Sequence, residues 1–282
     1  MALIRINQKF QAVPRGGAGE APGERMIRAA EMFGIGLDES YEVTIYDDFA
    51  VDVRPGDVVL VTGPSGSGKS VLVRRLEAAL REWPGRVVNL AAVDLGAGRP
   101  VIEMMQSPLD ESLRILSLAG LADAFLLLRS AEELSDGQRY RLRLARAIEA
   151  LLHDGDGKAR LHTAQPWHPT SADRSARRHG EEKPWRVLVA DEFCSTLDRL
   201  CARAVAYRVR RLADSDGLTV VAASASDDLV DDLEPDLWIE KEEGARIAVH
   251  YADPARQGVA AGHGTTRGRA RVACPARREA KT

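Results

Sequence analysis

The chain has 282 residues, of which 45% are apolar and 29% charged, with a formal net charge of -3; this is typical of a soluble globular protein and gives no general affinity for nucleic acid. Three cysteines without a C-x-x-C spacing exclude a disulfide framework and indicate a reducing compartment. There is no apolar run of 18 residues and no apolar signal-peptide core, so we expect a cytoplasmic protein without direct membrane insertion.

Residues 1–36 are interpreted as an N-terminal extension. It contains a predicted strand over Leu3–Phe10, a glycine-rich loop and a short amphipathic helix over Arg25–Phe33. Apolar and polar residues then alternate over Tyr41–Tyr46 and Phe49–Val53, a pattern that predicts two β elements ahead of the next motif.

The next motif is a glycine-rich loop that matches G-x-x-x-x-G-K-S/T between a predicted strand, Asp57–Thr62, and a predicted helix, Val71–Arg81. Successive N–H groups of such a loop and the helix dipole converge on phosphate oxygens. Lys69 can then reach the β- and γ-phosphates of ATP, and the Ser70 hydroxyl can bind Mg²⁺. The predicted nucleotide-binding residues are Gly63, Pro64, Ser65, Gly66, Ser67, Gly68, Lys69, Ser70 and Val71. The alternative, a glycine turn with an ordinary helix cap, leaves the Lys-Ser pair without a role.

The middle of the chain is predicted to be mostly helical. A strand over Arg86–Leu90 is followed by an apolar run that ends in Gln106. Apolar residues at helical spacing predict one helix over residues 110–129 and another over Arg139–Leu152, opened by a turn at Leu134–Gln138.

Residues 153–184 are interpreted as a polar insertion. They contain four of the six histidines and many Arg and Gly residues, with almost no periodicity. A zinc site or a nucleic-acid contact is the alternative, but the scattered histidine spacing favours a flexible loop.

Periodic structure returns with a predicted strand over Trp185–Glu192. A helix over residues 198–213, a buried strand over Leu218–Ala223 and a hairpin over residues 237–249 are predicted to follow. Residues 251–282 are predicted to form a disordered basic tail, because seven Arg or Lys residues face only two acidic ones from residue 252 onward. A solubilising role and a role in binding nucleic acid or a partner both remain open for this tail.

Two carboxylates end the strand downstream of the phosphate loop, a combination with a specific use. Asp191 can hold the Mg²⁺ shell, and Glu192 can polarise the water that attacks the γ-phosphate. Two solvated acids without a role are the alternative, and the phosphate loop upstream argues against it.

Together these motifs resemble the nucleotide-binding domain of the ATP-binding cassette (ABC) superfamily. Residues 134–138, Leu-Ser-Asp-Gly-Gln, resemble its Leu-Ser-Gly-Gly-Gln signature, Ser195–Asp198 resembles its D-loop, and Gln106 stands at its Q-loop glutamine. The resemblance covers residues 37–250. It implies an α/β P-loop NTPase fold of ABC type, a mixed sheet with an N-terminal antiparallel β part and a small helical subdomain over residues 107–152.

The resemblance also implies how ATP is bound. Tyr41 is expected to stack on adenine, with Tyr46 or Phe33 as alternatives, and Gln106 to approach Mg²⁺ and the reacting water. The family pairs two cassettes head to tail, so a second copy of this chain would contribute the signature turn to the γ-phosphate. The residues expected to do so are Ser135, Asp136, Gly137 and Gln138.

Three departures from the family pattern bear on function. Ser226 stands where the family has its switch histidine, which predicts slow hydrolysis because serine carries no charge. Phe193 replaces the usual proline after the catalytic Glu. The segment from Gln106 to Ser135 is short, so the helical subdomain, which transporter cassettes use to bind their membrane partner, is small. We expect a stand-alone ABC ATPase that dimerises on Mg·ATP and moves an unidentified effector protein. The alternatives are a transporter ATP-binding subunit and a nucleotide-gated, DNA-associated binding module with little turnover.

Overall fold

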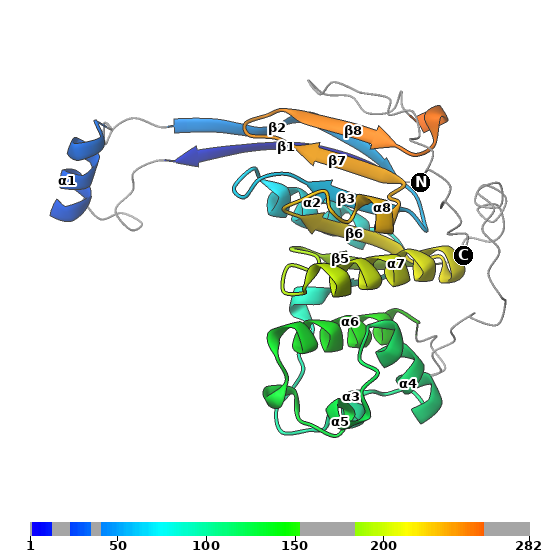
Figure 1. The fold of residues 1–282 in the computed structure, drawn as a ribbon. Coiled ribbons are helices and arrows are strands. Elements are labelled where there is room, and N and C mark those ends of the chain that lie inside the picture. The colour runs from blue at the N-terminus through cyan, green and yellow to red at the C-terminus, as the bar shows by residue number, and fades with distance from the viewer. Residues whose placement is uncertain (1, 13–22, 35–40, 153–183, 257–282) are drawn as a thin grey trace, which may run out of the picture.

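A computed structural model describes residues 2–12, 23–34, 41–152 and 184–256 of the chain (Figure 1). The predicted polar insertion, except for its last residue, and the tail from residue 257 lie outside this part. Within the described residues, no helix is both long and apolar enough to cross a lipid bilayer.

The core is a six-stranded sheet with the strand order β4-β5-β6-β3-β7-β8. The first five strands run parallel, and β8 pairs antiparallel with β7. This mixed sheet confirms the predicted fold class. The strands are β3 (Val58–Thr62), β4 (Gly85–Asn89), β5 (Trp185–Ala190), β6 (Thr219–Ser224), β7 (Leu237–Lys241) and β8 (Ile247–Tyr251).

Both faces of the central strands β3, β5 and β6 are covered, which explains why their sequences are almost continuously apolar. Leu60 of β3 packs with α6 (Asp136–Leu152) and α7 (Arg199–Asp216). Its neighbours Val59 and Val61 point to the opposite face and pack with α2 (Lys69–Arg81) and the antiparallel layer. The alternation of a β-strand therefore divides the core into two clusters with the sheet between them.

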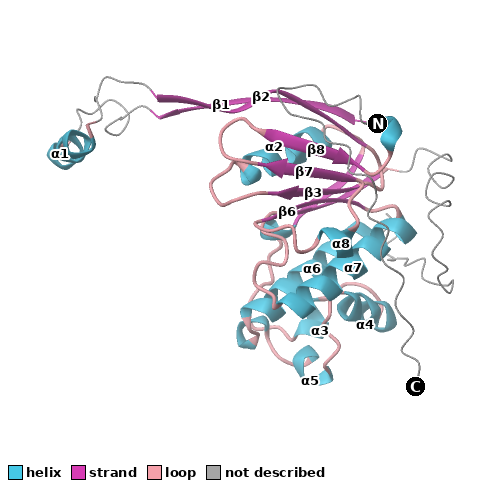
Figure 2. Cartoon of the chain, turned by 45° about the horizontal axis from the view of Figure 1, so that its top comes forward, coloured by secondary structure: helices cyan, strands magenta, loops and turns pink. Residues whose placement is uncertain are grey.

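The antiparallel layer consists of β1 (Ala2–Ala12) and β2 (Tyr41–Val53), paired from Ala2 opposite Val53 to Ala12 opposite Tyr41. β2 is one strand where two elements were predicted, and irregular pairing near Gln8 accommodates the positive φ of Asp48, 43°. Because β1 belongs to this layer, the expected boundary at residue 36 does not separate two packing units. The amphipathic helix α1 (Glu24–Phe33) lies at the outer end of the two-stranded ribbon (Figure 2).

The helical part is more broken than predicted. The expected single helix over residues 110–129 is wrong, because α4 (Leu109–Leu118) ends near Gly120, whose φ is 89°. A residue other than glycine is strained at this φ, so the chain turns here. The remaining helices are α3 (Val101–Met104), α5 (Ala124–Leu127) and α8 (Val230–Leu233), with short 3₁₀ turns at η1 (Leu90–Ala92), η2 (Ala131–Glu133) and η4 (Pro254–Arg256).

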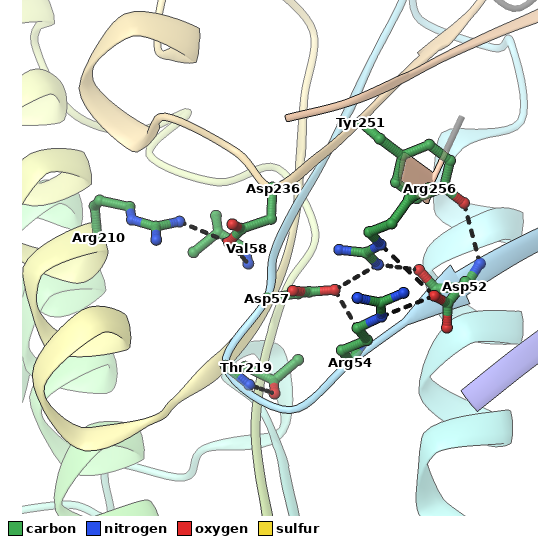
Figure 3. A network of polar contacts seen from close by, with 10 residues as sticks. Asp52, Arg54, Asp57, Val58, Arg210, Thr219, Asp236, Tyr251 and Arg256 are labelled. Atoms are coloured by element: carbon green, nitrogen blue, oxygen red, sulfur yellow. Dashed lines mark hydrogen bonds and ion pairs between the residues drawn. The ribbon is translucent and has the colours of Figure 1, made fainter. Parts of the chain in front are cut away.

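The chain stays folded past the predicted start of the tail at residue 251. Arg256 is 1% exposed, and its guanidinium donates to Asp57 Oδ2 at 2.8 Å and to the Asp52 carbonyl at 2.6 Å. Arg54 also pairs with Asp52, at 3.0 Å (Figure 3). Burial raises the pKa of Asp57, and the Arg256 hydrogen bond opposes that shift. The last described residues therefore tie β8 to the start of β3, and the predicted boundary lies too early.

Replacing Arg256 with alanine is expected to lower the free energy of unfolding by about 3–5 kcal/mol, because it removes a buried guanidinium that pairs with two buried carboxylates, Asp52 and Asp57. Urea unfolding measures this. Arg246→Ala is the matched control, since its ion pair with Glu242 is largely exposed and such pairs contribute about 0–1 kcal/mol. Equal losses in the two variants would contradict the role of Arg256.

Because Arg256 belongs to the folded part, tail deletions that test nucleic-acid binding should start at residue 257.

Candidate active site

The phosphate loop connects β3 to α2 and depends on two close backbone approaches. A Cβ atom at Gly63 would lie 2.0 Å from the Lys241 carbonyl oxygen, and one at Gly68 would lie 2.6 Å from Ile45 Cγ2. The φ values of these glycines, 147° and 100°, also disfavour other residues. The glycines of the motif therefore let the loop pass between the β7–β8 hairpin and β2.

Lys69 lies folded over this loop. Its Nζ donates to the carbonyl oxygens of Gly63 and Pro64, both at 2.7 Å. Ser70 follows in the first turn of α2 and is half-buried. The Val71 N–H donates to the Gly68 carbonyl at 3.0 Å, so this predicted ATP contact is used by the helix itself. The loop thus places one cation and one hydroxyl at the start of α2, the groups that a Mg-bound phosphate needs.

Tyr46 supports the loop from beneath. Its side chain is fully buried, and its hydroxyl donates to the Gly68 carbonyl at 2.9 Å. Burial raises the pKa of Tyr46 well above its ordinary value. Lys241 Nζ lies 5.4 Å from the ring centroid, and burial lowers the pKa of this lysine. In the sequence, Tyr46 falls in step with the polar residues Glu42 and Thr44, and nothing local marked it as a support for the loop.

This burial excludes Tyr46 as the residue that stacks on adenine. Phe33 is 79% exposed but lies on α1, at the far end of the ribbon from α2 (Figure 1). Tyr41 lies in β2, and its side chain is outside the described part of the structure. The assignment of Tyr41 to adenine therefore stays a prediction.

The sheet brings the two predicted carboxylates to the edge that carries the phosphate loop. β6 lies between β3 and β5, with Thr62 opposite Ser224 and Ala190 opposite Ala222. Because the three strands are parallel, the residues after Thr62 and Ala190 leave the same edge. Asp191 is half-buried and Glu192 is exposed, with a positive φ of 54°. Such a conformation is strained in a residue other than glycine and aims Glu192 away from the ordinary path of the strand.

The loop after Glu192 is held by two hydrogen bonds from distant elements. The Phe193 N–H donates to the Ala223 carbonyl at 2.6 Å, and the Cys194 N–H donates to the Tyr140 hydroxyl at 2.9 Å. A proline in place of Phe193 could not donate this bond. Burial raises the pKa of Cys194 to about 12 and that of Tyr140 well above its ordinary value. Tyr140 therefore ties α6 to the carboxylate edge, a role that its helical spacing did not indicate.

The signature turn begins α6 and faces solvent. The Ser135 N–H donates to Gln138 Oε1 at 2.9 Å, and the Gln138 N–H donates to Ser135 Oγ at 3.3 Å, a capping box that starts the helix earlier than predicted. The side chain of Asp136 is 81% exposed and pairs with Arg139 at 2.5 Å, so its negative charge is partly compensated. Gly137 packs against the D-loop of the same chain, since a Cβ atom there would lie 3.2 Å from Thr196 O.

Gln106 and Ser226 complete the set of predicted site residues. Gln106 is exposed and follows α3, and its backbone N–H donates to Glu149 at 2.7 Å. Ser226 is exposed after β6, and its hydroxyl donates to Asp228 Oδ2 at 3.3 Å. The residue at the switch position therefore adjoins a carboxylate and supplies no positive charge.

The oxygen atoms at this edge fit Mg²⁺. The Ser70 hydroxyl and the Asp191 carboxylate are the hard oxygen ligands that Mg²⁺ prefers, and the ion usually keeps waters and substrate phosphates as its other ligands. Among the described residues, no group of three or more His, Cys, Asp or Glu side chains is placed to enclose a metal ion, so these residues offer no dedicated cage.

The strand, glycine loop and helix over residues 58–81, with a carboxylate-ended strand one strand away, define a P-loop nucleoside triphosphatase. The family described as AAA ATPase domain matches residues 48–205, more than half of the chain. YjkB of Bacillus subtilis, a putative ABC transporter ATP-binding protein, is 31% identical over 180 residues, covering 53% of this chain and 69% of that protein. The chain belongs to the P-loop ATPases of this family and is a nucleotide-binding domain of the ABC type.

A second relative agrees with this assignment. The cytochrome c biogenesis ATP-binding export protein CcmA of Maricaulis maris is 30% identical over 164 residues, 45% of this chain and 74% of that protein. The predicted family, the ATPase class and ATP as the ligand are therefore confirmed. Among solved structures, the dimeric bacterial ABC transporter cassette MJ0796 has a TM-score of 0.47 and 14% identity, over 73% of this chain and 91% of that one.

Proposed function

We propose that this ATPase hydrolyses Mg·ATP slowly in a head-to-tail homodimer and uses the cycle to move a partner protein. The observation that carries the proposal is the shared sheet edge, where the loop over residues 63–70 and the pair Asp191–Glu192 emerge from parallel strands in register. This edge offers a phosphate cradle beside a carboxylate that can orient water, the two requirements of phosphoryl transfer to water.

Each residue at this edge is given one role. Lys69 exchanges its two carbonyl contacts for phosphate oxygens. Ser70, Gln106 and Asp191 would hold Mg²⁺, and a bound ion would supply neutralisation of the charge that develops on the phosphates. Glu192 accepts a hydrogen bond from the attacking water and orients it toward the γ-phosphate.

Slow turnover is proposed from the switch position. Ser226 offers one hydroxyl, which donates a hydrogen bond to Asp228 Oδ2 at 3.3 Å. A hydroxyl held by a carboxylate stabilises developing negative charge less than a cationic side chain would. ATP binding does not depend on this residue, so we expect tight ATP binding together with slow hydrolysis.

Dimerisation is proposed from the exposed start of α6. The capped turn at Ser135 and Gln138 presents a helix N-terminus to solvent, and such a terminus favours a phosphate group. A second copy of the chain would bring its own γ-phosphate to this turn, so ATP would hold two copies together and hydrolysis would release them.

A transporter ATP-binding subunit is the second candidate, because YjkB and CcmA carry transport-related names. One feature of this chain favours it: large apolar side chains are exposed on or beside α4 and α5, namely Leu109, Leu113, Phe125 and Leu128. Exposed apolar side chains in one helical region suit a contact with a partner protein. Either function agrees with a cytoplasmic location, and a nucleic-acid role would depend on tail residues outside the described part.

The proposal is tested by measuring ATP affinity, phosphate release and molecular mass on the same preparation. We expect tight Mg·ATP binding, slow phosphate release, and a dimer with ATP that becomes a monomer with ADP. A monomer at saturating Mg·ATP would refute the head-to-tail dimer. Co-purification with a membrane protein, accompanied by faster phosphate release, would favour the transporter candidate.

A further inference from the structure

Glu149 is a buried carboxylate that takes no part in the phosphate site. It lies on α6 and is 1% exposed. Its Oε1 atom accepts two consecutive backbone N–H groups, those of Gln106 and Ser107, both at 2.7 Å. Short hydrogen bonds to an ionised acceptor are among the strong ones in proteins, and two of them on one oxygen fix the orientation of a peptide segment.

Arg146 completes the clamp from the same helix. Its guanidinium pairs with Glu149 Oε2 at 3.1 Å and donates to the Met104 carbonyl. Residues 104–107 are therefore held at one carbonyl oxygen, by Arg146, and at two backbone N–H groups, by Glu149. Both side chains come from the same stretch of α6. Ser112 adds a hydrogen bond from its hydroxyl to the Ser107 carbonyl at 2.9 Å.

The same helix also reaches the catalytic edge. Tyr140, nine positions before Glu149 on α6, accepts the Cys194 N–H in the loop after Glu192. One rigid helix thus holds the backbone of Gln106 at one point and the loop of Glu192 at another. The distance between the two functional side chains is set through α6, because neither segment contains long regular structure of its own.

We infer that Glu149 is a positioning residue that places Gln106 for ATP hydrolysis. This inference rests on the role of Gln106 in the proposed function. Glu149 itself is buried, at 1% exposure. It acts by holding the Gln106 backbone, and its loss changes the chemical step while the phosphate loop continues to bind ATP.

A double-mutant cycle between the two residues tests this. Glu149→Gln keeps the size of the side chain, but its one carbonyl oxygen cannot serve both the two N–H groups and Arg146. We expect kcat to fall about 10- to 100-fold, the range for residues that orient a reacting group, with little change in KM. Gln106→Ala should cause a similar loss, and adding Glu149→Gln to it should cost nothing more, since the two act as a unit. Glu103→Gln, an exposed carboxylate just before this segment, is the matched control and should leave kcat unchanged.

The outcomes separate the inference from the proposed function. Full additivity of the two losses, or a wild-type kcat in Glu149→Gln, would overturn the positioning role. Hydrogen exchange gives a reading that does not need turnover: the Gln106 and Ser107 amides should exchange at least about tenfold faster in Glu149→Gln, while the β3 amides stay protected. Unchanged exchange at these two amides also overturns the inference, whereas absent phosphate release in the wild type would refute the proposed hydrolysis alone.

Discussion

Replacing Lys69 with alanine is expected to weaken Mg·ATP binding roughly a hundredfold. The Lys69 Nζ already makes two 2.7 Å hydrogen bonds to loop carbonyls, so the ammonium lies over the loop where phosphates would bind. Charge-assisted bonds are each worth about 1.5–3 kcal/mol, and 2.8 kcal/mol corresponds to about a hundredfold in the dissociation constant. Equilibrium titration with a fluorescent ATP analogue measures the change.

A matched control distinguishes this specific contact from a general loss of positive charge. Arg74→Ala removes an exposed cation from the same helix and should leave ATP affinity within about twofold, because exposed charges are screened by salt. Lys69→Ala should also keep its free energy of unfolding, since solvent can reach the freed carbonyls. Equal affinity in Lys69→Ala and Arg74→Ala would contradict the phosphate role of Lys69.

Replacing Glu192 with glutamine should reduce kcat about 10²- to 10⁴-fold, the usual contribution of a general base, while ATP affinity is retained. Glutamine preserves the size of the side chain but is a much weaker acceptor for the proton of the attacking water. The positive φ of Glu192, 54°, is held by neighbours that this substitution does not touch. Because ATP then stays uncleaved, the variant should accumulate as an ATP-bound dimer, visible by light scattering.

The control for Glu192 is an exposed glutamate at the far end of α2. Glu82→Gln makes the same change in charge at the C-terminal end of this helix and should leave both kcat and dimerisation unchanged. Wild-type phosphate release from Glu192→Gln would disprove its assignment as the residue that orients water. A slow variant that stays monomeric with ATP would instead separate catalysis from dimerisation.

The elements near the phosphate loop were predictable because their signals are local. β3 ends at Thr62 and α2 begins at Lys69, close to the predicted positions, since a buried apolar run and a helix start flank the motif. The prediction of one helix over residues 110–129 was wrong, and the reason is also local. Gly120 has a φ of 89°, which ends the helix, although the apolar spacing continues beyond it. Apolar periodicity continued past a point where the backbone turned.

The supports of the site were not predictable, because their partners are distant in the chain. Tyr46 meets Gly68 across 22 positions, Tyr140 meets Cys194 across 54, Glu149 meets Gln106 across 43 and Arg256 meets Asp57 across 199. A tyrosine in a strand or a glutamate in a helix is common, and only its burial beside a particular backbone group gives it a role. No pattern within one segment carries that information.

By itself the sequence determined the chemistry of the site: a contiguous loop whose glycines, lysine and serine define a phosphate cradle, and a strand that ends in two carboxylates. Folding decided which groups meet. Parallel pairing through β6 brings residues after Thr62 and Ala190 to one edge, and α6 connects that edge to Gln106. The physical reason is that a phosphate cradle needs only local backbone geometry, whereas the placement of buried polar groups depends on contacts formed when distant segments pack.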